Sequence, residues 1–496
     1  MPEPAPRRFE PTLASLRSHE VPAWYEDAKL GIFVHWTMAS VPAFAPREHD
    51  IQELLRARYR DLQVYIPYVE WYENSLRFPE SPVARFHRER YGERPYASFR
   101  DDFVAGGIAR FDPDAWADVF AGAGARYVVL VTKHHDGFCL WPSRVRNPRR
   151  EGWASPRDCV GELARAVRAR GLRFGVYYSG GLDWTFEPMP VRTVADVMAS
   201  VPGGSYPAYA DAQVRELVAR VAPDVLWNDI AWPTGRAGLW RLFADYYAAV
   251  LEGVVNDRWA TRSWVTDALR LRPLRALADR AIERLVARGR ANLTPPRPPH
   301  CDFRTPEYAV FPDVRREKWE CVRGIDKSFG YNRASREEDF LSRRELVHSF
   351  ADIVSKNGNL LLNVGPRGED AVVPDAQLAR LRWLGEFLAR SGEAVYGTQP
   401  WRRAEGTTRE GVAVRFSARA DAVYAIVLGW PAGAVLTLED VALAEGGGVE
   451  LLGRGPVRWQ RDGTALRVEL GEAPRDEPAF ALALRGGVAP AGAAGR

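Results

Sequence analysis

Short apolar runs alternate with helix-like segments from residue 30 onward, and this alternation constrains the fold more than any other feature of the sequence. The runs cover residues 30–36, 127–132, 173–179, 223–229, 254–259 and 359–366. Their length and apolar character are typical of buried parallel strands. Strands separated by helices predict parallel β/α units with right-handed crossovers. Five or more such units can close into a barrel, so we predict a (β/α)8-like TIM barrel.

A change in sequence pattern predicts a second domain. Residues 1–392 are expected to form the barrel. From about residue 395 short strands with turns follow, including the hairpin signal Asp462-Gly463, and they predict a C-terminal antiparallel β-sandwich over residues 393–496. A doubly wound open sheet is the alternative to the barrel. No glycine-rich phosphate loop follows the first strand, which argues against the nucleotide-binding forms of that sheet.

An arginine-rich segment at about residues 261–300 interrupts the β/α rhythm. It predicts a helical insertion with one apolar stripe, formed by Leu274, Leu277, Ala278, Ala281, Ile282, Leu285 and Val286. We expect this stripe to pack against the barrel. Binding of a membrane or a partner protein is the alternative use of a basic amphipathic helix.

Composition bears on partners, cofactors and location. The formal charge of +4 over 496 residues is nearly balanced, so no nucleic-acid partner is expected. The four cysteines are widely separated, which predicts neither a disulfide framework nor a zinc site, and no metal or other cofactor is expected. No apolar run approaches the roughly 20 residues that span a bilayer, and no secretory signal is evident. We therefore expect a cytoplasmic protein without a membrane partner; its oligomeric state stays open.

Polar residues stand at the C-terminal ends of the predicted strands. They are His35, His134, His135, Tyr177, Asp229 and Arg258. In a barrel these ends meet on one rim, where barrel enzymes place their chemistry. Asp229 taken alone is more simply the N-cap of the next helix, and the histidines taken alone fit hydrogen-bonded core positions. Together the six residues predict one polar pocket.

A second carboxylate would make this pocket a glycosidase site, because glycoside hydrolysis uses a pair of carboxyl groups. The stretch 301–308, which contains Asp302 and Glu307, offers a second acid. Glu70 and Trp71 lie in a long irregular segment, residues 47–110, that can reach over a pocket. In isolation Glu70 would be interpreted as a solvated surface carboxylate.

In its motifs the chain resembles the retaining α-L-fucosidases of glycoside hydrolase family 29, which combine a barrel with a β-sandwich. The matching stretches are residues 31–36, 133–138, 175–183, 227–233, 256–259, 302–308, 318–320, 328–332 and 359–366. The resemblance runs from about residue 24 to about residue 398. The chain departs from the bacterial relatives in the long stretch between Trp259 and Cys301, and in Cys301 itself, where those relatives carry a tryptophan.

The resemblance implies an exo-acting retaining glycosidase that hydrolyses α-L-fucosides through a fucosyl-enzyme intermediate. It implies that Asp229 is the nucleophile and Glu307 the general acid/base. The residues that it places in the fucose pocket are His35, Glu70, Trp71, His134, His135, Tyr177, Trp227, Arg258 and Phe329. The expected substrate is a small molecule or an oligosaccharide that bears terminal α-L-fucose.

Two other functions stay open. Histidines at barrel strand ends also bind zinc in metal-dependent hydrolases. Alternation of side chains along a strand is expected to point the rings of His134 and His135 apart, which argues against a shared metal. A catalytically inactive protein that binds fucose is the other alternative.

Overall fold

The computed structural model describes residues 9–288, 297–441, 443, 446–472 and 476–486. Residues 1–8, on which the expectation about a secretory signal depends, and residues 289–296 of the predicted insertion lie outside the described residues. Within the described part of the chain, no helix combines the length and the apolar character needed to cross a membrane.

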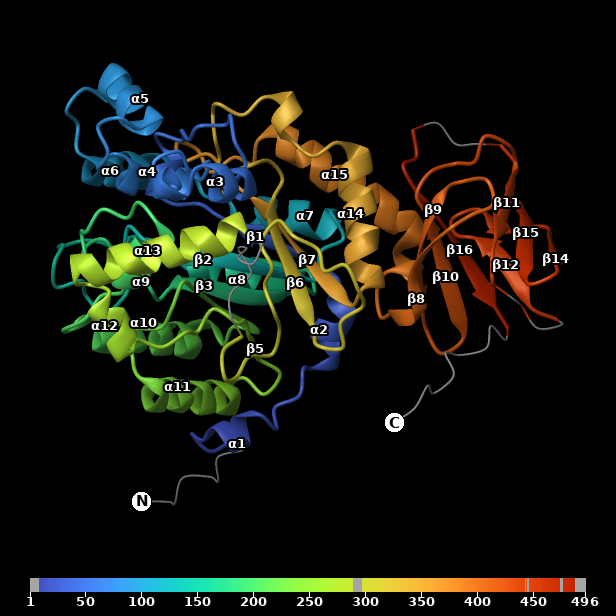
Figure 1. Ribbon diagram of the computed structural model, residues 1–496, viewed down its shortest axis with the longest axis horizontal. Helices are drawn as coiled ribbons and strands as arrows, with labels where there is room; N and C mark the ends of the chain where they lie inside the picture. Colours follow the sequence, from blue (N-terminus) through green and yellow to red (C-terminus); the bar gives the residue numbers. More distant parts are fainter. Residues whose placement is uncertain (1–8, 289–296, 442, 444–445, 473–475, 487–496) are drawn as a thin grey trace.

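The N-terminal part is a curled sheet of seven parallel strands, seen in the left half of Figure 1. The strands are β1 (Leu30–Val34), β2 (Tyr127–Lys133), β3 (Arg173–Ser179), β4 (Val225–Asp229), β5 (Val254–Val255), β6 (Trp319–Gly324) and β7 (Gly358–Val364). Their order in the sheet is β5-β4-β3-β2-β1-β7-β6. The predicted parallel, barrel-like sheet is confirmed; β6 is a strand that the search for apolar runs missed.

An irregular segment takes the place of an eighth strand between β5 and β6. The Asp302 N–H donates to the Val255 carbonyl at 3.0 Å, which joins residues 302–308 to β5. On the other side the Tyr308 N–H donates to the Val322 carbonyl of β6 at 2.9 Å. This segment therefore links the two edge strands of the sheet.

Side chains of the strands alternate between two cores. In β2, Tyr127, Val129 and Val131 belong to a cluster inside the ring, whereas Val128 and Leu130 pack in the cluster between the sheet and the helices. This is the period of two that a strand imposes on its side chains. The inner cluster forms the base on which the residues at the strand ends rest.

Helices cover the outside of the sheet and fill the long connection after β1 (Figure 1). The helices are α1 (Leu13–Leu16), α2 (Ala23–Ala28), α3 (Ile51–Ala57), α4 (Tyr72–Ser75), α5 (Pro82–Tyr91), α6 (Phe99–Phe103), α7 (Pro113–Gly122), α8 (Cys159–Ala169), α9 (Val194–Ala199), α10 (Tyr206–Val221), α11 (Arg236–Ala249), α12 (Trp264–Ala268), α13 (Arg272–Ala287), α14 (Arg343–Ser355) and α15 (Asp375–Ser391). Residues 47–110, expected to be irregular, contain four of these helices, α3 to α6. Short helices of this kind lack the long periodic pattern on which a sequence-based prediction depends.

In its described residues the predicted insertion contains α12 and α13, and the apolar stripe of α13 is only partly covered. Leu274, Leu277 and Leu285 of α13 are 42%, 58% and 42% exposed. The Tyr59 hydroxyl donates to Asp279 at 2.9 Å. Within the stripe, Val286 is buried and Ile282 packs partly buried against the inner cluster. The expected packing against the barrel is therefore seen for Ile282 and Val286, whereas the three leucines are exposed.

The C-terminal part consists of two antiparallel sheets, with orders β13-β12-β16-β10-β9-β8 and β11-β15-β14. The strands are β8 (Gln399–Thr407), β9 (Ala413–Ala418), β10 (Ala422–Val427), β11 (Val435–Leu438), β12 (Gly448–Leu451), β13 (Gly455–Pro456), β14 (Trp459–Asp462), β15 (Ala465–Glu469) and β16 (Phe480–Arg485). One apolar cluster contains Val423 of β10 and Leu466 of β15, so the two sheets enclose a common core. The predicted hairpin at Asp462-Gly463 joins β14 to β15, with Gly463 at φ +62°.

Helices α14 and α15 lie between the parallel sheet and the C-terminal sheets (Figure 1). Helix α14 contacts β7 on one side and β8 and β9 on the other. The predicted domain boundary at residues 392/393 falls between α15 and β8, and it stays a prediction.

Candidate active site

All eleven residues predicted for the site line one cavity of about 210 Å³. They are His35, Glu70, Trp71, His134, His135, Tyr177, Trp227, Asp229, Arg258, Glu307 and Phe329. Their convergence comes from the sheet, because most of them stand on or just after the C-terminal ends of parallel strands, and those ends meet on one rim. The structure brings the residues together; their roles stay predictions.

A larger cavity of about 630 Å³ lies elsewhere, lined mainly by residues 143–154 together with Tyr209 and Gln213. It contains one carboxylate, Glu151, and none of the eleven predicted residues. The larger cavity therefore lacks the pair of carboxylates that the predicted chemistry needs.

One arginine joins the two predicted carboxylates. Arg258 follows β5, and its Nη1 lies 3.0 Å from Asp229 Oδ1 while its Nη2 lies 3.0 Å from Glu307 Oε2. Its Nε donates to Thr305 Oγ1 at 3.1 Å, and its guanidinium lies 4.9 Å from the centre of the Trp227 ring. Burial opposes the charge on Arg258, but the two carboxylates raise the pKa of its guanidinium above the ordinary value. Asp229 and Glu307 therefore flank one small space.

A tyrosine contacts each carboxylate as well. The Tyr177 hydroxyl donates to Asp229 Oδ2 at 2.8 Å, and the Tyr68 hydroxyl donates to Glu307 Oε1 at 2.6 Å. Tyr68 is a site residue that the sequence analysis missed. The one available signal was its position two residues before Glu70.

The residue after each carboxylate has a left-handed backbone although it is not glycine. Ile230 has φ +67° and Tyr308 has φ +50°. Such conformations cost about 1–3 kcal/mol each and persist only where the surroundings enforce them. At Asp229 the gain is local, because the Ile230 N–H donates to Asp229 Oδ1 at 2.8 Å.

The three histidines form one cluster at the ends of β1 and β2. Ring centres of His35 and His134 are 5.7 Å apart, and those of His134 and His135 are 4.0 Å apart. The expectation that the last two rings point apart is wrong, because both residues lie beyond Lys133, where β2 and its alternation end. Burial lowers the pKa of His35 to about 4, and it lowers the pKa values of His134 and His135 well below the ordinary value.

Glu70 is a buried residue, in contrast to its interpretation in isolation. It lies in the 3₁₀ turn η3 (Val69–Trp71) and is 4% exposed. Its Oε1 accepts a hydrogen bond from the Gly330 N–H, and burial raises the pKa of its carboxyl group to about 8. The next residue, Trp71, packs edge-on against the His135 ring at 5.1 Å. The connection after β1 thus contributes a wall of the cavity.

A fourth carboxyl group lies behind the wall of the cavity. Glu320 of β6 is fully buried, and it accepts hydrogen bonds from the Trp227 indole at 3.0 Å and from the hydroxyls of Tyr25 and Tyr127 at 2.9 and 2.5 Å. Burial raises the pKa of Glu320 to about 7. Glu320 does not line the cavity, so it holds Trp227 rather than a ligand.

The donor atoms of the cavity do not favour the metal-dependent alternative. Within the described ranges, no group of three or more His, Cys, Asp and Glu side chains is arranged so that it could hold a metal ion. Nδ1 of His35 is occupied by Asn363, and Nδ1 of His135 is occupied by Ser179.

Comparison with known families decides the class of the protein. The model of the α-L-fucosidase family matches residues 2–393. The chain belongs to the α-L-fucosidase family. The enzyme is therefore a glycoside hydrolase, and its residues 407–485 match the α-L-fucosidase C-terminal domain.

Named relatives cover nearly the whole enzyme. Human tissue α-L-fucosidase is 32% identical over 469 residues, which cover 92% of this chain and 86% of the human chain. A solved structure of Thermotoga maritima α-fucosidase in complex with a mechanism-based inhibitor is 40% identical, with a TM-score of 0.79 over 96% of this chain and 100% of that chain. The complex of the same bacterial enzyme with fucose has the same identity and coverage and a TM-score of 0.78.

Proposed function

We propose that the enzyme removes terminal α-L-fucose with retention of configuration, by double displacement through a covalent fucosyl-enzyme intermediate. The observation that carries this proposal is the shared contact of Asp229 and Glu307 with Arg258, at 3.0 Å on each side. A retaining enzyme needs its two carboxyl groups about 5 to 5.5 Å apart. Because both carboxylates bind the same guanidinium, they lie close enough together for this mechanism. A cavity of about 210 Å³ has room for one terminal sugar.

Asp229 is the proposed nucleophile and Glu307 the proposed acid and base. Bonds from Tyr177, Arg258 and the Ile230 N–H hold the Asp229 carboxylate in one orientation. Its attack on the anomeric carbon breaks the glycosidic bond and forms an ester, while Glu307 gives a proton to the leaving oxygen. Glu307 then takes a proton from a water molecule, which attacks the anomeric carbon from the face that the leaving group occupied and releases Asp229. The two inversions together give retention of configuration.

The remaining predicted residues are proposed to bind the sugar. The histidines and Glu70 offer polar contacts for ring hydroxyls. Phe329, whose ring centre is 5.0 Å from that of His35, offers an apolar surface for the methyl group of fucose. One methyl group gives only about 1–3 kcal/mol of discrimination, so the hydroxyl contacts must supply much of the selectivity. The bacterial relative solved with fucose supports this choice of sugar.

The first test is turnover of 4-nitrophenyl α-L-fucoside, compared with the β-anomer and with the α-galactoside. We expect hydrolysis of the α-fucoside, and far slower hydrolysis of the other two. Binding of fucose without turnover would instead support the inactive fucose-binding protein.

The second test assigns the carboxylates. Asp229→Ala should abolish turnover without unfolding, and added azide should restore it with β-fucosyl azide as product; an α product would contradict retention through Asp229. Glu307→Ala should retain more activity on substrates with good leaving groups than on natural glycans. Equal losses on both substrate types would place the acid elsewhere.

A further inference from the structure

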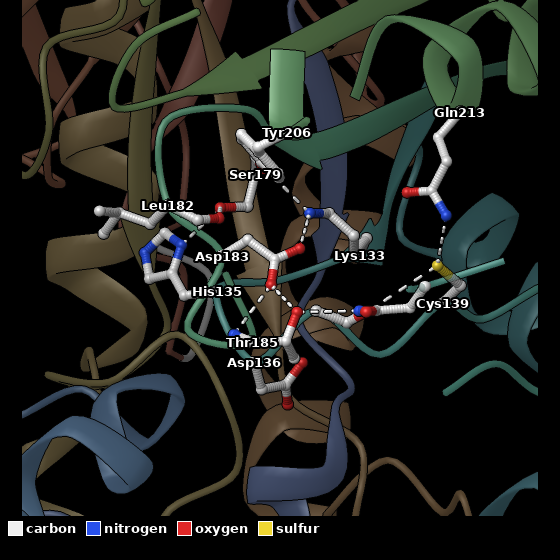
Figure 2. Close-up of polar contacts among 12 residues, drawn as sticks. Lys133, His135, Asp136, Cys139, Ser179, Leu182, Asp183, Thr185, Tyr206 and Gln213 are labelled. Carbon is white, nitrogen blue, oxygen red and sulfur yellow. Dashed lines mark hydrogen bonds and ion pairs between the residues drawn. The ribbon is translucent and has the colours of Figure 1, made fainter. Parts of the chain in front are cut away.

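A serine fixes the position of the proton on His135. His135 Nδ1 lies 2.6 Å from Ser179 Oγ, and the same oxygen lies 2.7 Å from the Leu182 carbonyl, as Figure 2 shows. A carbonyl oxygen can only accept, and a serine hydroxyl has one hydrogen to give. That hydrogen goes to Leu182, so Ser179 Oγ accepts from His135. The proton of a neutral His135 ring is therefore on Nδ1, and Nε2 carries a lone pair.

An asparagine does the same for His35. Asn363, in β7, donates from its Nδ2 to the Phe329 carbonyl, which fixes the orientation of the amide. The other amide atom, Oδ1, then faces His35 Nδ1 at 2.5 Å. Because an amide oxygen only accepts, His35 Nδ1 carries the proton and His35 Nε2 carries a lone pair.

Both lone pairs are available to a ligand. Among the described residues no hydrogen bond engages Nε2 of His35 or of His135, and both residues line the cavity. Burial lowers the pKa of both rings, which favours the neutral form. His134 lies between them, 5.7 Å and 4.0 Å from the two ring centres, and no protein hydrogen bond within the described part of the chain fixes its tautomer.

We infer that Ser179 and Asn363 are positioning residues that hold His135 and His35 as hydrogen-bond acceptors. The cavity then selects sugars that donate a hydrogen bond from two different hydroxyl groups. For the identity of the sugar this inference rests on the proposed function; the tautomers themselves do not depend on it.

A buried ion pair holds the loop that places the Leu182 carbonyl next to Ser179. Lys133 Nζ lies 2.7 Å from Asp183 Oδ2, and both side chains are fully buried (Figure 2). Thr185 Oγ1 donates to the other Asp183 oxygen at 2.5 Å, which closes the loop after β3 on itself. The Tyr206 hydroxyl donates to the Ser179 carbonyl at 3.1 Å. Leu182 is thus held where its carbonyl takes the Ser179 hydrogen.

The direct test is the nitrogen NMR of the imidazole rings in the resting enzyme, labelled with ¹⁵N-histidine. The chain has eight histidines, and single His→Gln variants assign the signals. We expect His35 and His135 to show a protonated Nδ1 and an unprotonated Nε2. A protonated Nε2 on either ring would overturn the inference, and this outcome is independent of whether the enzyme hydrolyses fucosides.

Two variants separate positioning from stability. Ser179→Ala should remove the fixed tautomer signature of His135 and raise KM about tenfold, with a smaller change in kcat, because the ring loses its orientation for binding. Thr185→Val changes the same loop without touching the imidazole, and it should keep the His135 signature. If Ser179→Ala keeps the signature, or if Thr185→Val loses it equally while both remain folded, Ser179 does not set the tautomer.

Fluorinated sugars test the consequence for selectivity. Fluorine replaces a hydroxyl with a group of similar size that accepts weakly and cannot donate. An NMR titration measures binding of methyl α-L-fucoside and its 2-, 3- and 4-deoxyfluoro derivatives to the Asp229→Ala variant. Because this variant should not turn over substrate, fluorine cannot affect the result through the chemical step. We expect at least two of the three derivatives to bind about 10- to 100-fold more weakly. Losses below threefold at two or more positions would overturn the requirement for two donors.

Discussion

Replacing Arg258 with lysine tests whether one guanidinium must serve both carboxylates. Arg258 bonds to Asp229, Glu307 and Thr305 from three different nitrogens. A lysine has one ammonium nitrogen and cannot span both carboxylates. The variant should lose one charge-assisted bond of about 1.5–3 kcal/mol and one neutral bond of about 0.5–1.5 kcal/mol. A loss of about 2–4.5 kcal/mol in the transition state corresponds to about 30- to 2000-fold in kcat/KM.

The assay is kcat/KM on 4-nitrophenyl α-L-fucoside, together with the free energy of unfolding from urea titration. The free energy of unfolding shows how far the substitution destabilises the folded enzyme, separately from its effect on the transition state. Arg262→Lys is the matched control, because Arg262 pairs with Asp267 at the surface and has no contact with either carboxylate. The reasoning is refuted if Arg258→Lys keeps kcat/KM within about threefold of the parent.

Two further predictions concern buried charges. Burial raises the pKa of Glu70 from 4.5 to about 8. The stability that the protonated carboxyl group contributes is therefore full below pH 4.5 and falls by about 5 kcal/mol as the pH rises through 8. Glu70→Gln should flatten the pH dependence of the urea-unfolding free energy between about pH 5 and 8, and an unchanged slope would contradict this. Lys133→Met leaves buried Asp183 unpaired and should cost about 3–5 kcal/mol, part of which Asp183→Asn should restore in the double variant. A double variant no more stable than Lys133→Met would count against the pair.

The sequence was informative wherever the parallel sheet decides the position of a side chain. His35, Tyr177 and Asp229 follow or end apolar runs, and such positions meet on one rim whatever the connections do. Glu307 reaches the same cavity in spite of the long insertion before it, because its segment is bonded to the neighbouring strands. Local pattern and barrel topology were sufficient for His35, Tyr177 and Asp229, whereas Glu307 was chosen through the family resemblance.

The remaining features could not be predicted, for three different reasons. The burial of Glu70 depends on Gly330, more than two hundred residues away, and nothing in the sequence around Glu70 indicates it. Strand β6 contains Glu320 and Arg323, so it lacks a continuous apolar run. The close approach of the His134 and His135 rings depends on where β2 ends, and strand ends are hard to predict within two residues.

The segment 302–308 unites two tasks that a regular eighth strand would leave to separate residues. The hydrogen bonds that connect it to β5 and β6 are also the bonds that carry Glu307 to the rim. Completion of the ring and placement of the proposed proton donor therefore depend on the same hydrogen bonds. If these hydrogen bonds broke, the three histidines would keep their places, but by the proposed mechanism the enzyme would cleave only fucosides with good leaving groups.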